Sequence, residues 1–177
     1  MCGIIGYAGA RQAAPIILEG LAALEYRGYD SAGMAVASGG VLQRYRRIGR
    51  VAELAKAVPE EVPGSAGIAH TRWATHGGVT EANAHPHTDA DNRVAVVHNG
   101  IIENAESIRM QLLEAGYVFA SETDTEVVVH LIDHLWTDGM PMEDAVSAAL
   151  RSIDVAYSIA VVSSRDPNKI VVARDAS

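Results

Sequence analysis

The stretch CGIIGY at residues 2–7, directly after the first methionine, decides how the fold begins. Chain ends are usually poorly ordered unless packing holds them, and Ile4, Ile5 and Tyr7 predict a strand that enters the core. Such a strand would hold Cys2 in place at its start. Cys2 is the single cysteine of the chain. An intramolecular disulfide and a zinc site built from several thiolates are therefore excluded.

A cysteine at position 2 has a special chemistry once Met1 is removed. The residue then carries a thiol, which titrates at about 8.5, and a free α-amino group, which titrates at about 7.7 to 8.0. The amine can take the proton of the thiol at neutral pH, directly or through a water molecule, so one residue supplies nucleophile and base. The alternative is a small buried apolar residue at the start of a strand. Cys2 alone leaves both interpretations open.

Length and composition indicate one globular domain. A chain of 177 residues can bury roughly 70% of its unfolded surface, and its 49% apolar and 20% charged residues exclude a disordered or fibrous protein. Fourteen Lys and Arg against 22 Asp and Glu give a net charge of −8, so we expect no nucleic acid partner. No apolar run reaches the roughly 18 residues of a membrane span, and the chain start lacks the basic region of a secretory signal. We expect no membrane partner and a cytoplasmic location.

Hydrophobic periodicity and turn residues predict the order of strands and helices. We expect strands at 4–7, 32–37, 41–47, 67–75, 93–98, 156–164 and 169–175, and helices at 15–26, 51–58, 105–115 and 141–153, with another beyond Thr123 that carries Val128, Ile132 and Leu135 on one stripe. The strands and helices do not alternate strictly, which favours an α+β fold of layers with mostly antiparallel pairing.

Two short motifs each allow two interpretations. Asn99-Gly100 follows an apolar run and is typical of a type I′ turn, but an Asn amide and a Gly backbone N–H can also form an oxyanion hole. Thr123 and Glu126 have the spacing of a helix capping box, with Asp124 in the first turn. That aspartate could also bind a substrate cation at a rigid helix start.

Arg72 and a group of histidines are further candidate site residues. A guanidinium matches a carboxylate in a bidentate manner, although most arginines are surface charges. Among the histidines, His85 and His87 could place two rings on one strand face as metal ligands, which would indicate a metallohydrolase. The chain has no helical HExxH pair to support that alternative. A non-catalytic small-molecule domain is a third class, which would keep a pocket without needing the nucleophile.

Five segments, taken in order, resemble the glutaminase domains of glucosamine-6-phosphate synthases, which are class II glutamine amidotransferases with an N-terminal nucleophile. The segments are CGIIGY at 2–7, LEYRGYDSAG at 24–33, HTRWATHG at 70–77, VVHNGIIEN at 96–104 and SETDTE at 121–126. The resemblance runs from Cys2 to the final predicted hairpin. EYRGYDSAG favours this sugar-phosphate branch over the amidophosphoribosyltransferases, which typically read closer to HRGQESAG and remain the alternative.

The resemblance implies an αββα sandwich of the N-terminal-nucleophile hydrolase type and assigns residues to its site. It gives catalysis to Cys2, Asn99 and Gly100, substrate binding to Arg72, Trp73, Thr75, His76 and Asp124, and supporting positions beside them to Arg27 and His85. In the family, the arginine holds the α-carboxylate of glutamine and the aspartate its α-ammonium group. All the clustered histidines match family positions that need no metal, and the resemblance implies no cofactor.

The implied activity is hydrolysis of L-glutamine to L-glutamate and ammonia through a thioester on Cys2. In the parent enzyme, expected to be a homodimer, the ammonia would aminate fructose 6-phosphate to glucosamine 6-phosphate. Family domains continue beyond the VVARDAS segment at 171–177 into a linker and a sugar-isomerase domain. We therefore expect residues 1–177 to be a glutaminase domain that is incomplete at its C-terminus, with the isomerase domain absent.

Overall fold

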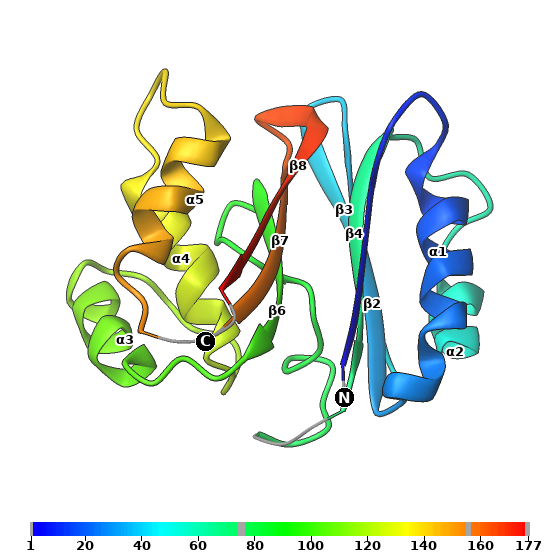
Figure 1. Cartoon of the computed structure of the whole chain (residues 1–177), viewed down its shortest axis with the longest axis horizontal. Coiled ribbons are helices and arrows are strands. Elements are labelled where there is room, and N and C mark those ends of the chain that lie inside the picture. The colour runs from blue at the N-terminus through cyan, green and yellow to red at the C-terminus, as the bar shows by residue number, and fades with distance from the viewer. Residues whose placement is uncertain (1, 74–76, 155–156, 176–177) are drawn as a thin grey trace.

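Two four-stranded antiparallel sheets lie face to face between two layers of helices (Figure 1). The structure is a computed structural model that describes residues 2–73, 77–154 and 157–175. The first sheet has the order β1-β4-β2-β3, with β1 Gly3–Ala8, β4 Ala66–Arg72, β2 Ser31–Ser38 and β3 Val41–Ile48. The second has the order β5-β6-β7-β8, with β5 His87–Thr88, β6 Val94–Gly100, β7 Tyr157–Ser163 and β8 Asp166–Asp175. The predicted α+β class and αββα layering are confirmed.

The helices cover the outer faces of the sheets (Figure 1). The first sheet carries α1 Ala13–Ala23 and α2 Val51–Ala57, and the second carries α3 Ala105–Glu114, α4 Thr125–Leu135 and α5 Met142–Leu150. Ile17 and Leu21 of α1, and Val128 and Ile132 of α4, are completely buried, as an apolar stripe that faces a sheet requires. The helix predicted at 15–26 ends at Ala23, and a short 3-10 turn, η1 Glu25–Arg27, follows it. No helix in the described residues is long and apolar enough to cross a bilayer.

Aliphatic side chains, most of them small or β-branched, fill the space between the two sheets. The first sheet contributes Ala35, Ala37, Leu42, Ala66 and Ile68, and the second contributes Ala95, Val97, Ala160 and Val162. All of these side chains are buried. Central strands such as β6 are thus apolar on both faces, because one face meets the other sheet and the opposite face meets helices.

The strands predicted at 32–37 and 41–47 form a hairpin, and so do those predicted at 156–164 and 169–175, but the second turn is shorter than the gap of residues 165–168 left between the predicted strands. Gly39 and Gly40 connect β2 to β3, both with positive φ, as a type I′ turn demands. In the second hairpin only Ser164 and Arg165 separate β7 from β8, so the turn predicted at 165–168 is wrong. Pro167 lies inside edge strand β8, where a register shift accommodates a residue that has no N–H to donate.

Strand register gathers the candidate site at one end of the sheets. The antiparallel pairing of β1 with β4 sets Gly3 opposite Thr71, so the start of β1 lies beside the end of β4. In the facing sheet, β6 ends with Asn99 and Gly100 at the same end of the sandwich. Residues near positions 3, 71 and 100 therefore converge there.

Candidate active site

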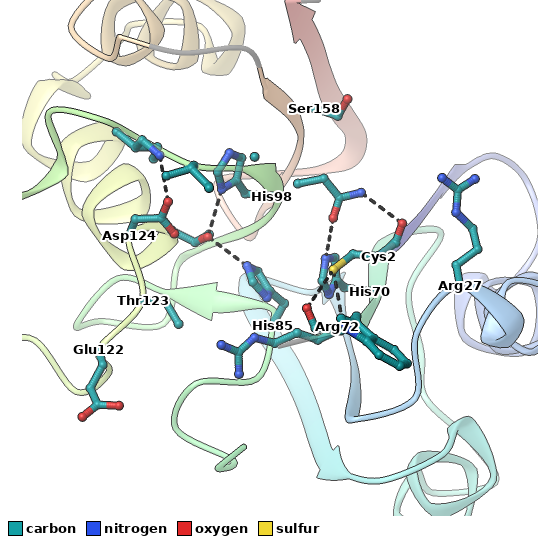
Figure 2. Close-up of a pocket in the computed structure, with 16 residues that line it drawn as sticks. Cys2, Arg27, His70, Arg72, His85, His98, Glu122, Thr123, Asp124 and Ser158 are labelled. Atoms are coloured by element: carbon teal, nitrogen blue, oxygen red, sulfur yellow. Dashed lines mark hydrogen bonds between the residues drawn. The ribbon is translucent and has the colours of Figure 1, made fainter. Parts of the chain in front are cut away.

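A cavity of about 660 Å³ opens where the start of β1 and the ends of β4 and β6 meet the start of α4 (Figure 2). All predicted site residues that the structure describes line it: Cys2, Arg27, Arg72, Trp73, His85, Asn99, Gly100 and Asp124. The predicted substrate residues Thr75 and His76 lie outside the described residues. The fold thus assembles one cavity from side chains that are separated by up to about 120 positions in sequence, from Cys2 to Asp124.

The Cys2 thiol is held against the end of β4. Its Sγ accepts a hydrogen bond from the Trp73 backbone N–H at 3.2 Å and lies 3.7 Å from the Trp73 carbonyl oxygen. The next residue is also fixed, because the Gly3 N–H donates to the Thr71 hydroxyl at 3.2 Å. Cys2 is only partly buried. The sulfur is therefore positioned, supported by a backbone donor and accessible from the cavity, as a nucleophile must be.

The loop that contains Arg27 packs against the peptide group that contacts the sulfur. A Cβ at Gly28 would lie 2.9 Å from the carbonyl carbon of Arg72 and 3.1 Å from the Trp73 nitrogen, so only glycine allows this approach. The Asp30 N–H donates to the Arg72 carbonyl at 3.0 Å. Arg27 extends from this loop into the cavity wall (Figure 2). Trp73 is 42% exposed, so it forms part of the rim and does not belong to the core.

Asn99 lies across the cavity from β4 and does not form a turn. It pairs with Ser158, and Gly100 pairs with Tyr157, so both belong to β6 and the type I′ turn is wrong. The Asn99 Nδ2 donates to the Cys2 carbonyl at 3.4 Å, and its Oδ1 lies 2.8 Å from His70 Nε2. Gly100 has a φ of 148°, a conformation that a residue with a side chain rarely adopts.

Two groups of opposite charge face the cavity, and the capping box predicted near one of them does not form. Arg72 is only 6% exposed, and its Nη1 donates to the Gly78 carbonyl at 3.2 Å. Asp124 precedes α4, where its Oδ2 accepts the Ile102 N–H at 2.8 Å. Thr123 does not cap the helix because its hydroxyl bonds His87 Nε2 at 3.0 Å instead. The Glu126 carboxylate accepts the backbone N–H groups of Ala120 and Ser121 at 2.8 and 2.7 Å.

Asn83 and Glu122 connect these two charged groups, and no sequence motif predicts this link. The Asn83 Nδ2 donates to the Gly78 carbonyl at 3.0 Å, which is the oxygen that Arg72 also contacts, and to Glu122 Oε2 at 3.1 Å. The Glu122 N–H donates back to Asn83 Oδ1 at 3.0 Å. Gly78 is thereby tied to Glu122, which lies two residues before Asp124. Glu122, Thr125 and Ser158 also line the cavity beyond the predicted set.

Four buried histidines lie at the cavity: His70, His85 and His98 line it, and His87 packs against His85. Burial lowers the pKa of His70 to about 4 and that of His87 to about 3, holds the pKa of His85 well below its usual value, and lowers that of His98. The Thr125 hydroxyl bonds both His85 Nε2, at 2.9 Å, and His98 Nδ1, at 3.1 Å. These rings are therefore neutral at pH 7; threonine hydroxyls hold His85, His87 and His98, and the Asn99 amide holds His70.

The hydrogen bonds of His85 and His87 also test whether these two residues could be metal ligands. The His85 and His87 rings meet edge to face at 4.9 Å, and their Nε2 atoms point to different threonine hydroxyls. Among the described residues, no three His, Cys, Asp or Glu side chains are grouped to hold a metal ion. The geometry of this cluster favours hydrogen bonding of the His85 and His87 Nε2 atoms to separate hydroxyls over shared coordination of a metal ion.

We predict that stability falls as the pH drops from 7 to 5. Histidines with depressed native pKa bind fewer protons when folded than unfolded between pH 6.5 and the native values, so the free energy of unfolding decreases on acidification in that window. The slope is about 1.4 kcal/mol per pH unit for each histidine fully inside the window. Urea unfolding at pH 7, 6 and 5 measures it. His87→Gln keeps a donor for Thr123 and should reduce the dependence of the unfolding free energy on pH. A free energy of unfolding that stays constant between pH 7 and 5 would contradict the conclusion that the buried rings are neutral.

Comparisons with known proteins agree with the geometry. Residues 70–177 match the family described as a glutamine amidotransferase domain. Over its whole length the chain is 52% identical to glutamine–fructose-6-phosphate aminotransferase (isomerizing) of Chlorobaculum tepidum and 54% identical to that of Pseudomonas putida. It spans only 30% and 29% of those proteins.

A solved structure matches the same fold. Glutamine phosphoribosylpyrophosphate amidotransferase from B. subtilis, complexed with ADP and GMP, has a TM-score of 0.81 and 27% identity. The match covers 99% of this chain and 37% of that one. The identity is about half of that to the fructose-6-phosphate aminotransferases, so the phosphoribosyl branch is the less supported alternative. The chain therefore belongs to the glutamine amidotransferase domain family, in the class II branch that has the N-terminal-nucleophile fold.

Proposed function

We propose that this chain hydrolyses L-glutamine to L-glutamate and ammonia with Cys2 as nucleophile. One observation carries the proposal: the accessible Cys2 sulfur and the Asn99 amide lie on one cavity that also presents a buried cation, Arg72, and an anion, Asp124. A free amino acid carries the complementary carboxylate and ammonium charges. The cavity thus combines a nucleophile, a candidate oxyanion donor and charges that match the zwitterion of the substrate.

The reaction follows from these groups. The α-amino group of Cys2 takes the thiol proton, and the thiolate attacks the side-chain amide carbon of glutamine, forming a C–S bond. Negative charge develops on the amide oxygen, where the Asn99 side chain and the Gly100 backbone N–H donate to it. The C–N bond then breaks, and the Cys2 ammonium returns its proton to the departing nitrogen as ammonia is released.

The second half of the reaction releases glutamate. A water molecule attacks the thioester carbon while the Cys2 amine takes its proton, and the C–S bond breaks to regenerate the thiol. The Cys2 ammonium returns that proton to the departing sulfur, so over the whole cycle the same amine acts twice as base and twice as acid. Neutral histidines around the cavity leave this amine as the group best suited to that task, since their pKa values are held low by burial.

We propose that Arg72 holds the α-carboxylate of glutamine and Asp124 its α-ammonium group. Arg72→Ala and Asp124→Ala should each raise KM for glutamine by about 10-fold or more with a smaller change in kcat, since these contacts exist in the resting complex. Steady-state kinetics measure both parameters. Arg47→Ala, which removes an exposed arginine that contacts surface Glu81 and the Arg46 carbonyl, is the matched control and should leave KM unchanged.

Thermal melting must accompany these kinetics, because Asp124 holds the Ile102 N–H and Arg72 holds the Gly78 carbonyl. A variant that melts like the unsubstituted chain and retains its KM would remove that residue from substrate binding.

The activity itself is tested with a glutamine analogue that bears an electrophilic diazo-ketone. The analogue should add once to the chain, and peptide mapping should place the adduct on Cys2. Prior incubation with L-glutamine should protect the thiol, whereas L-asparagine, one methylene shorter, should protect less. Release of glutamate and ammonia in equal amounts completes the test. A chain that neither hydrolyses glutamine nor is labelled at Cys2 would refute the proposal.

We further propose that residues 1–177 serve as the glutaminase domain of a larger enzyme that uses the ammonia to aminate fructose 6-phosphate. The support is the name of the relatives that are more than 50% identical and that extend well beyond the matched region. The sugar would bind in a separate isomerase domain of that enzyme. Coupled assays with the full-length enzyme should show glucosamine 6-phosphate formed at the expense of glutamine.

A further inference from the structure

We propose that His70 is a positioning residue that sets the orientation of the Asn99 side-chain amide and thereby builds the oxyanion hole. This inference rests on the proposed function, since it concerns the amide that stabilises the reaction. His70 belongs to β4 of the first sheet, and Asn99 to β6 of the second. The hydrogen bond between His70 Nε2 and Asn99 Oδ1, at 2.8 Å, therefore joins the two sheets at the cavity (Figure 2).

An Asn amide has two orientations that occupy nearly the same space but exchange donor and acceptor. In the orientation found here, Nδ2 faces the Cys2 carbonyl at 3.4 Å and Oδ1 faces His70. The reversed amide would place Oδ1 against the Cys2 carbonyl oxygen, so two acceptors would face each other. Only the observed orientation directs N–H groups toward the residue that carries the nucleophile.

The contact also decides which nitrogen of His70 carries the proton. Since Oδ1 of Asn99 can only accept, His70 Nε2 must donate, and the ring must carry its hydrogen there. The ring is 1% exposed, and burial lowers its pKa to about 4, so it is neutral at pH 7 and has a single N–H. The one donor of His70 is thus committed to Asn99.

Packing holds the imidazole in this position. The His70 ring lies against the His85 ring, with centroids 4.2 Å apart and planes tilted by 35°. His85 is fixed in turn by the Thr125 hydroxyl at 2.9 Å. On its strand, His70 pairs with Ile4 of β1 on one side and Gly33 of β2 on the other. A buried ring that packs against His85 and stands on a central strand can hold an amide without reorganising during the reaction.

The test replaces His70 by two amide side chains whose nitrogen donors occupy the positions of different imidazole nitrogens. Glutamine puts its Nε2 close to the position of the imidazole Nε2, whereas asparagine reaches only to the position of Nδ1. His70→Asn and His70→Phe should therefore lower kcat by about 10-fold or more and leave KM for glutamine nearly unchanged, because the orienting bond is lost. His70→Gln should recover most of kcat. If His70 only filled space, the kcat of His70→Gln would not exceed that of His70→Asn.

Thermal melting separates loss of folding from loss of orientation. If folded His70→Phe turned over at the wild-type kcat, or if folded His70→Gln were as slow as His70→Asn, the positioning role would be wrong. If the variants do not fold, ¹⁵N NMR of the unsubstituted chain at pH 7 decides, since it shows directly which ring nitrogen of His70 is protonated. A proton on Nδ1 in place of Nε2 would overturn the proposal.

The NMR measurement also separates this inference from the proposed function. A chain that proved inactive toward glutamine would refute the function, while the tautomer of His70 would still show whether the bond to Asn99 exists. Conversely, an active chain with the Nδ1 tautomer would retain the function and lose only the role of His70.

Discussion

Chain that retains Met1 should show no glutaminase activity, and removal of Met1 from the same sample should restore it. With Met1 attached, the nitrogen of Cys2 is an amide, which cannot take the thiol proton or return it to ammonia. Intact mass verifies the state of the chain, and an aminopeptidase that removes Met1 provides the matched sample. Release of ammonia from glutamine before and after treatment measures the difference. Normal turnover by verified Met1-retaining chain would contradict the N-terminal-nucleophile mechanism.

Cys2→Ser tests the nucleophile while preserving the amine. A hydroxyl is a far weaker nucleophile than a thiol at this pH, so hydrolysis should fall to background, and the diazo-ketone analogue should no longer label the chain. The substitution keeps a small side chain next to the Trp73 N–H, so the melting temperature should change little. Glutamine should still protect this variant against unfolding, because Arg72 and Asp124 remain.

Much of the fold could be predicted from the sequence because its strands and helices follow local patterns. The alternation in β1, the apolar stripe of α4 and the double glycine between β2 and β3 each specify a local structure that tertiary packing did not override. The predicted start of α1 was off by two residues and its end by three, which is where such patterns carry least information. The cytoplasmic location and the homodimeric parent enzyme stay predictions.

The local motifs at the site were less reliable, because distant partners competed for the same groups. Asn99-Gly100 has the composition of a turn, but pairing with β7 continues through both residues and keeps them in a strand. Thr123 and Glu126 have the capping-box spacing, yet the hydroxyl bonds His87 and the carboxylate bonds the backbone at 120 and 121. Neither partner is visible from spacing alone.

The choice of Cys2, Arg72, Asn99 and Asp124 rested on a resemblance, and the fold brings those residues to one cavity. The groups that hold them in place were harder to foresee. Asn83 joins the two charged sides through contacts to Gly78 and Glu122, and a lone Asn in a polar stretch carries no signal of that role. Placement of this kind depends on how two sheets meet, which no single segment encodes.

The Cys2 nucleophile and the proposed oxyanion donor Asn99 come from different sheets, and this arrangement explains why loss of the donor should be costly. Cys2 is anchored to the first sheet through Gly3 and Thr71, while Asn99 extends from the second. The apolar layer between the sheets fixes their separation. The donor is therefore set in place by folding before substrate arrives, and little reorganisation is left for the reaction itself.

Asn99→Ala should lower kcat by about 10² to 10³ with a modest change in KM, because the lost donor acts mainly on charge that develops in the transition state. Asn99→Asp keeps the shape but places a negative charge beside the oxyanion, so its kcat should be lower still. Asn168→Ala, an exposed asparagine on β8 outside the cavity, is the matched control and should be unaffected. Steady-state kinetics on variants with native melting curves measure these changes.

An unchanged kcat in Asn99→Ala would show that Asn99 has no role as an oxyanion donor and is only the end of a strand. The proposed role of His70 in orienting the Asn99 amide would then have no effect on catalysis.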